Sequence, residues 1–213
     1  MNQMTFSDME YSGRKRVTQK EKFLREMNDI IPWTDWANRI LPFYPKGKRG
    51  RPPLMFIGEA PGGQEEAQGT PFVGQAGQQL QEFLDAVGLK REEIWISNTV
   101  KVRPTRISPS GSVANRTPTP KEVEWFLPLL RQEILMVHPG FLVTLGNVPL
   151  HALDPEAPTI RGCHGAWRKA VIHGIPIPMI PLYHPASLIY RPALREAYQQ
   201  DMMRVKERLL HGV

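Results

Sequence analysis

Cysteine is almost absent from this sequence, and long apolar runs are absent altogether. Of 213 residues only Cys163 is a cysteine. One cysteine excludes an internal disulfide and a metal or iron–sulfur site built from cysteines alone. The most apolar stretch, residues 126–146, is interrupted by charged side chains, so no segment reaches the ~18 apolar residues of a membrane span. The first residues lack the apolar segment of a secretory signal. We therefore expect a cytoplasmic protein.

A large excess of basic over acidic residues occurs in one part of the chain only. The net charge is +6, and residues 1–53 hold 11 Lys and Arg against 6 Asp and Glu. Residues 54–213 hold 16 against 15, so the basicity belongs to the first quarter of the chain. This first quarter ends in a Pro- and Gly-rich basic stretch, which is typical of a linker. We predict two parts, a short helical leader with its linker over 1–53 and a domain over 54–213.

Strand and helix patterns alternate from Leu54 onward. Four apolar runs predict buried strands, at 54–58, 93–102, 140–147 and 177–185. Amphipathic helices are predicted between and after them, over 77–89, 120–137 and 193–210. Residues 103–119 are polar and rich in Pro and Ser, and predict a long loop. The fold class is therefore α/β, a three-layer α/β/α sandwich with a largely parallel four-stranded sheet.

Polar side chains lie toward the carboxyl ends of three of these strands. Glu59 follows the first strand, whereas Asn98 and His184 lie in the C-terminal halves of the second and the fourth. Each residue type alone is more often structural than catalytic. Ligands of such sheets bind beyond the carboxyl ends of the strands, so a carboxylate, an amide and an imidazole are expected around one crevice. Phe72 lies in the loop after the first strand, and it either anchors this loop in the core or forms a platform on which a flat ligand stacks. Glycines flank it at positions 62, 63, 69, 74 and 77.

The motifs GEAPGGQEEAQGTPFVGQAG, SNTVKVRPT, NRTPTPKEV, LVTLGN and YHPAS occur in this order. Together they resemble the uracil-DNA glycosylase superfamily, and family 4 in particular, over about residues 54–213. The resemblance implies that Glu59 positions the attacking water and that His184 stabilises negative charge at uracil O2. It implies that Phe72 stacks on the flipped uracil and that Asn98 selects it. Gly58 and Ala60 are then expected to line the same pocket.

The same resemblance implies a DNA contact made by the segment PASLIYRPA, as a loop that enters the minor groove. The expected DNA-binding residues are Pro185, Ala186, Ser187, Leu188, Arg191, Lys101 and Arg103. The implied activity is that of a monofunctional hydrolase in DNA repair, which removes uracil and leaves an abasic site. Uracil-containing DNA is the expected partner, no membrane is involved, and the expected state is a monomer.

Two features depart from family 4. Its members typically hold a [4Fe–4S] cluster on four cysteines, whereas this chain has Val102 and Phe126 at two of those places and no cysteine before the first strand. We therefore expect no cluster and no other cofactor or metal, with Val102 and Phe126 making apolar contacts instead. Residues 5–53 resemble the N-terminus of IS5-type transposases, which suggests a chimera.

Two alternatives to a uracil-DNA glycosylase remain from the sequence. They are a non-catalytic DNA-binding protein with a degenerate glycosylase fold and a glycosylase for another deaminated base.

Overall fold

A computed structural model describes residues 53–109 and 111–211 of the chain. The predicted leader, apart from its last residue, lies outside them. The central sheet has the strand order β2-β1-β5-β7-β6. Its strands are β1 (Leu54–Gly58), β2 (Trp95–Asn98), β5 (Phe141–Leu145), β6 (Arg168–Ile172) and β7 (Ile175–Leu182). The first four in this order pair in parallel, and β6 runs antiparallel to β7. The predicted α/β class with a largely parallel sheet is confirmed.

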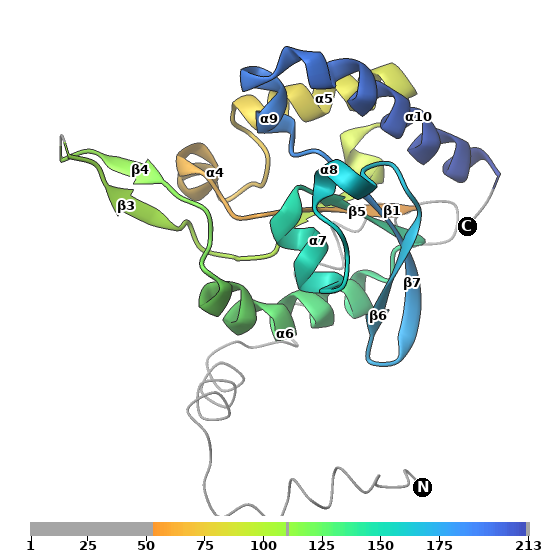
Figure 1. Ribbon diagram of the computed structural model, residues 1–213, viewed down its shortest axis with the longest axis horizontal. Coiled ribbons are helices and arrows are strands. Elements are labelled where there is room, and N and C mark those ends of the chain that lie inside the picture. Colours follow the sequence, from red (N-terminus) through yellow and green to blue (C-terminus); the bar gives the residue numbers. More distant parts are fainter. Residues whose placement is uncertain (1–52, 110, 212–213) are drawn as a thin grey trace, which may run out of the picture. The chain divides into compact units, whose positions relative to one another are not determined.

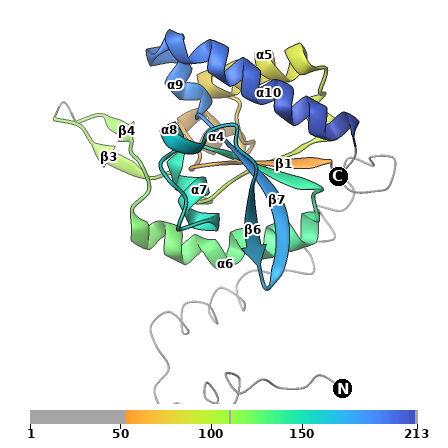
Figure 2. The same cartoon turned by 45° about the vertical axis from the view of Figure 1, so that its right-hand side comes forward.

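Helices cover both faces of this sheet. They are α4 (Gly63–Gln68), α5 (Gln75–Val87), α6 (Pro120–Val137), α7 (Asn147–Leu153), α8 (Ile160–Cys163), α9 (Pro185–Tyr190) and α10 (Arg195–Leu210), with 3₁₀ turns η2 (Arg91–Glu93) and η3 (Pro192–Leu194). Helices α5, α9 and α10 lie over one face, and α6 and α7 lie under the other (Figures 1 and 2). No described helix is long and apolar enough to cross a membrane.

Alternation along β1 explains the two cores. Leu54 and Phe56 pack with α5 and α10, whereas Met55 and Ile57 pack with α6 and α7. Successive side chains of a strand point to opposite faces, so a strand covered on both sides reads as one continuous apolar run. All four side chains are fully buried. The three-layer prediction is thereby confirmed.

The sheet has five strands, and the prediction of four was wrong. The strand that was missed, β6, forms a hairpin with β7. Its turn is His173-Gly174, and both residues have positive φ, 48° and 81°. Two consecutive residues of this kind form the tight turn that suits the twist of a β-hairpin. In β6 only Ala170 and Ile172 are fully buried, so it lacks the apolar run that identifies the other strands.

Residues 103–119 do not form the plain loop that the sequence predicted. They contain a second, two-stranded sheet, β3 (Thr105–Ile107) and β4 (Val113–Asn115). This hairpin extends away from the rest of the fold in both views (Figures 1 and 2). Its strands are short and mostly exposed, so their sequence shows no alternation of apolar and polar residues that would predict a strand. Likewise, the segment PASLIY forms helix α9 rather than a loop, because Pro185 occupies its first turn and His184 caps it.

Helix α6 begins where the sequence predicts. Oγ1 of Thr119 accepts a hydrogen bond from the Glu122 N–H at 3.3 Å, and the Glu122 carboxylate accepts from the Thr119 N–H at 2.7 Å. This reciprocal pair is the predicted capping box, with Pro120 as the first helical residue. Arg116 forms an ion pair with Glu122 at 2.6 Å. The start of α6 is thus tied to the end of the β3–β4 hairpin.

Candidate active site

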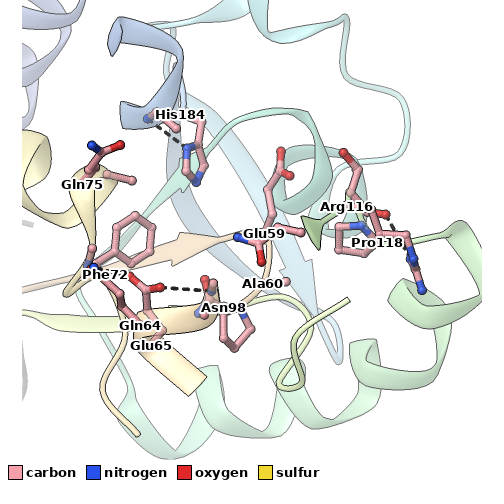
Figure 3. A pocket seen from close by; sticks show the side chains of 18 of the residues that line it. Glu59, Ala60, Gln64, Glu65, Phe72, Gln75, Asn98, Arg116, Pro118 and His184 are labelled. Carbon is pink, nitrogen blue, oxygen red and sulfur yellow. Dashed lines mark hydrogen bonds between the residues drawn. The ribbon is translucent and has the colours of Figure 1, made fainter. Parts of the chain in front are cut away.

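A cleft of about 800 Å³ lies at the carboxyl ends of the central strands. The side chains predicted from the strand ends meet there: Glu59, Asn98, Phe72 and His184 all line it (Figure 3). Ala60, expected beside them, lines it as well. The parallel arrangement explains the meeting, because β1, β2 and β7 all end at the same edge of the sheet.

Asn98 and Phe72 form one wall of the cleft, and Gly58 makes room for both. The register of β1 and β2 places Asn98 directly opposite Gly58. A Cβ atom on Gly58 would lie 2.5 Å from Oδ1 of Asn98 and 2.7 Å from the Phe72 ring. Within the described part of the chain, Oδ1 of Asn98 is buried and receives no hydrogen bond. An amide oxygen without a donor in a cleft is free to accept one from a ligand.

Phe72 is held in an unusual backbone conformation. Its φ is +55°, which lies in a backbone region that residues other than glycine rarely adopt. Gly77 in α5 makes this possible, because a Cβ there would lie 1.9 Å from the carbonyl oxygen of Phe72. The Phe72 side chain is 7% exposed and joins the core shared with α5 and α10. Phe72 is therefore a core anchor and a wall of the cleft at the same time.

Glu65 of α4 was not predicted as a site residue, yet it holds this wall together. Its carboxylate accepts backbone N–H groups from Gly62 at 3.1 Å, Val73 at 3.0 Å and Gly74 at 2.8 Å. The bonds join the start of α4 to the residues directly after Phe72. Hydrogen bonds to a charged acceptor are stronger than those between neutral groups. The available sequence signal was a glutamate three residues after Gly62, the capping-box spacing.

Glu59 and His184 both lie close to Gly146. A Cβ on Gly146, whose φ is +93°, would lie 3.1 Å from Oε1 of Glu59 and 3.4 Å from Cβ of His184. The N–H of Gly146 donates to the Leu182 carbonyl at 2.9 Å, which joins the end of β5 to the end of β7. Burial raises the pKa of the Glu59 carboxyl above its usual value. A positive charge close to a buried carboxylate stabilises its ionised form.

His184 is held as a neutral imidazole. Burial lowers its pKa to about 4, against the smaller opposing effect of the Glu65 carboxylate. Its Nδ1 accepts the backbone N–H of Ala186 at 3.2 Å, so the proton of the neutral ring is on Nε2. The ring centre lies 5.8 Å from that of Phe72. In Figure 3 the ring edge away from this hydrogen bond faces the cleft, which places an N–H donor there.

Sequence comparison identifies relatives of this chain. Residues 44–205 match the sequence model of the uracil DNA glycosylase superfamily. A type-4 uracil-DNA glycosylase of Archaeoglobus fulgidus is 37% identical over 158 residues, which cover 72% of this chain and 75% of the relative. One of Pyrobaculum aerophilum is 37% identical over 153 residues, covering 70% of this chain and 74% of that protein. The chain belongs to the uracil-DNA glycosylase superfamily.

A solved structure supports the fold of this superfamily member. The crystal structure of wild-type Pedobacter heparinus SMUG2 matches with a TM-score of 0.52 and covers 92% of this chain and 100% of that one. The sequence identity of the pair is 13%, so the likeness concerns the fold alone. It agrees with the α/β architecture, in which a parallel sheet is covered by helices on both faces.

The residues predicted to bind DNA occupy varied places in this superfamily fold. Ala186 lines the cleft, whereas Pro185 and Leu188 are buried and anchor α9. Ser187 and Arg191 line a second, neighbouring cleft. The exposed apolar side chains of α9 are Ile189 and Tyr190, at 40% and 82%, and both line the main cleft. Neither was singled out from the sequence, where the alternation of buried and exposed positions in α9 is not apparent.

Two of the three basic residues predicted to bind DNA, Lys101 and Arg103, are each held by carboxylates. The Lys101 ammonium contacts Glu133 and donates to the Ser97 hydroxyl at 2.7 Å. Arg103 forms an ion pair with Glu66 at 3.1 Å and donates to Oδ1 of Asn115 at 2.7 Å. These partners are all contributed by neighbouring elements of the fold. The role of both cations in DNA binding stays a prediction.

A four-cysteine iron–sulfur cluster does not fit this superfamily member. Its one cysteine, Cys163, is buried, with Sγ 3.5 Å from the carbonyl oxygens of Pro158 and Thr159. Val102 offers no ligand atom, and it is 55% exposed, so it does not make the buried apolar contact that we expected. No group of three or more His, Cys, Asp or Glu that could hold a metal occurs among the described residues.

Proposed function

We propose that this protein hydrolyses the N-glycosidic bond of uracil in DNA and leaves an abasic site. The observation that carries the proposal is the buried Asn98 amide, whose Oδ1 accepts no hydrogen bond from the described residues and lies beside the Phe72 ring. A stacked base is out of reach of such a cleft, so the nucleotide must be flipped out of the duplex to enter. Membership of the uracil-DNA glycosylase superfamily supports the same reaction.

Base choice follows from the Asn98 amide. Uracil presents an acceptor at O4 and a donor at N3, whereas cytosine presents the reverse. With Oδ1 accepting from N3–H and Nδ2 donating to O4, Asn98 pairs with uracil and leaves groups unpaired against cytosine. Each buried unpaired group costs about 1–3 kcal/mol. Phe72 adds stacking energy but little discrimination, because every base has a flat face.

The hydrolytic step uses Glu59 and His184. The bond from C1′ to N1 breaks with both electrons leaving on uracil, so positive charge develops on the sugar and negative charge on the base. The Glu59 carboxylate stabilises the sugar cation, orients a water toward C1′ and accepts its proton. The neutral His184 donates from Nε2 to O2 of uracil and stabilises the leaving anion, which is later protonated by solvent. This division of roles requires an anionic Glu59, and it suits a His184 whose pKa burial lowers to about 4.

The remaining parts of the proposal concern the whole chain. We propose that it acts as a monomer in the cytoplasm, without an iron–sulfur cluster. We further propose that residues 1–53 form a separate basic leader, with five of the six net charges, and that catalysis resides in 54–213. Deleting 1–53 should weaken non-specific DNA binding and its dependence on salt, with little change in excision. Loss of the folded domain on deletion would contradict this division.

The test of the proposal is base release from oligonucleotides that carry uracil, cytosine, thymine or hypoxanthine at one position. We expect uracil release alone, and Glu59→Gln and His184→Ala should each lower its single-turnover rate by several factors of ten while the thermal unfolding transition is retained. Preferential release of hypoxanthine would favour a glycosylase for another deaminated base. DNA binding without release of any base would favour the non-catalytic alternative.

A further inference from the structure

The β3–β4 hairpin presents apolar side chains to solvent. Ile107 and Val113 lie directly opposite each other across the two strands, and they are 79% and 59% exposed. An exposed pair of this kind contributes little to the stability of the domain. Contiguous apolar side chains on the surface, bordered by polar residues, are a feature of binding surfaces.

The base of this hairpin is fixed by hydrogen bonds. The Arg116 N–H donates to the Pro104 carbonyl at 3.1 Å, and Nε of Arg116 donates to the Thr105 carbonyl at 3.0 Å. Arg103 bonds Asn115 from the other side at 2.7 Å. Two-stranded hairpins are marginal by themselves, so these bonds set the direction in which this one projects. The hairpin is therefore preorganised with respect to the cleft.

The charge around the hairpin favours an anionic partner. From Ile94 to Lys121 the sequence contains five Lys and Arg and no Asp or Glu. Lys101, Arg103 and Arg116 have carboxylate partners from other segments. Arg106, in contrast, is exposed and forms no ion pair with any described residue, and it lines the cleft. Of the remaining two cations, Lys121 lies over the Trp125 ring, and Arg106 is the one left available on the hairpin itself.

The hairpin and helix α9 form opposite parts of the cleft rim. Arg106 and Asn115 line it from the hairpin, and Ile189 and Tyr190 line it from α9. Figures 1 and 2 show β3 and β4 extending outward, away from the central sheet. A nucleotide chain that delivers a base into the cleft must cross this rim.

We propose that the β3–β4 hairpin is a second DNA contact, in which Arg106 binds a backbone phosphate and Ile107 with Val113 packs against sugars or bases next to the flipped nucleotide. This inference rests on the proposed function, since it takes DNA as the molecule that occupies the cleft. Each strand of the hairpin has three residues, which at ~3.3 Å each make it about 10 Å long. That length corresponds to roughly three nucleotides at ~3.4 Å per step, so the contact extends beyond the flipped base.

The experiment compares two hairpin variants with a matched control. The variants are Arg106→Gln and the double variant Ile107→Ser/Val113→Ser. The control is Val171→Ser/Ile175→Ser, which removes an apolar pair that is also more than half exposed, at 58% and 52%, from the β6–β7 hairpin. Dissociation constants and single-turnover rates are measured on a long uracil-containing oligonucleotide and on shorter ones trimmed from either end. Thermal unfolding checks that each variant is folded.

On the long oligonucleotide we expect both hairpin variants to bind about tenfold more weakly than wild type, with an unchanged rate at saturation. Arg106→Gln should also lower the slope of log K against log salt by about one, because one phosphate contact is lost. The defect should vanish once the oligonucleotide no longer reaches the hairpin, and the control should match wild type throughout.

Affinity equal to wild type at every length would overturn the inference, and so would a loss confined to the saturating rate. If the double variant does not fold, Arg106→Gln, at an exposed position, decides by the same two criteria. A wild-type protein that binds DNA but releases no uracil would refute the proposed function, while the hairpin would still be judged by its effect on binding.

Discussion

Replacement of Gly58 by alanine adds one methyl group at the point where the proposed uracil pocket is narrowest. The new Cβ would lie 2.5 Å from Oδ1 of Asn98 and 2.7 Å from the Phe72 ring. Non-bonded heavy atoms are comfortable at about 3.5–4 Å, so the amide, the ring or the strand end must move by about 1 Å. All of these groups are buried and packed, so none can move freely.

The size of the effect follows from this overlap. Inserting a methyl into a well-packed site costs about 1–3 kcal/mol. If that cost falls on the transition state, the excision rate drops by roughly 5- to 150-fold, because each ~1.4 kcal/mol is a factor of ten. DNA affinity should change little, because the cleft rim and the hairpin are unaltered. The methyl narrows the recess and leaves the outer contacts in place.

The assay is single-turnover uracil release by Gly58→Ala, with Gly162→Ala as the control. A Cβ on Gly162, which lies in α8 and outside the cleft, would have only an ordinary contact, 3.5 Å to Pro158. We expect the control to stay within twofold of wild type. A Gly58→Ala protein that also excises uracil within twofold of wild type would refute the assignment of Asn98 and Phe72 as the walls of the base pocket.

Three further predictions follow from the site. Glu65→Ala removes the acceptor of three backbone N–H groups, so it should lower the excision rate at least tenfold, and Glu65→Gln should restore part of it; equal rates for both variants and wild type would contradict the positioning role. The rate should fall toward acid as Glu59, whose pKa is raised by burial, becomes protonated, and His184 should contribute no inflection near pH 6.5, because its pKa is lowered to about 4. An inflection at pH 6.5 that His184→Gln abolishes would contradict a neutral His184. Finally, the purified protein should be colourless, and stoichiometric iron with absorbance in the visible range would disprove the absence of a cluster.

The effect of pH on stability has a definite sign. The pKa of His184 is lower in the folded protein, about 4, than the ~6.5 of an unfolded histidine. Between these values the unfolded chain binds the extra proton, so stability falls as the pH drops from about 6.5 to about 4. Denaturant titrations of wild type and His184→Gln across this range measure the contribution of the one group.

The sequence predicted the site better than its surroundings. Glu59, Asn98 and His184 could be placed together because buried parallel strands read as apolar runs and end at one edge of the sheet. Glu65 could not be found in this way, because its partners are backbone N–H groups that come together only when the Phe72 turn folds. Ile107 and Val113 stand on strands of three residues, too short and too exposed for periodicity to appear.

The measurement that tests the account most directly is the release of free uracil from an oligonucleotide with one uracil, quantified together with abasic sites. We expect one uracil and one abasic site per cleaved nucleotide, with no release from the matched oligonucleotide that carries thymine. Glu59→Gln should lower both products by the same factor. Stoichiometric binding of the uracil oligonucleotide without either product, or equal release of uracil and thymine, would contradict the account.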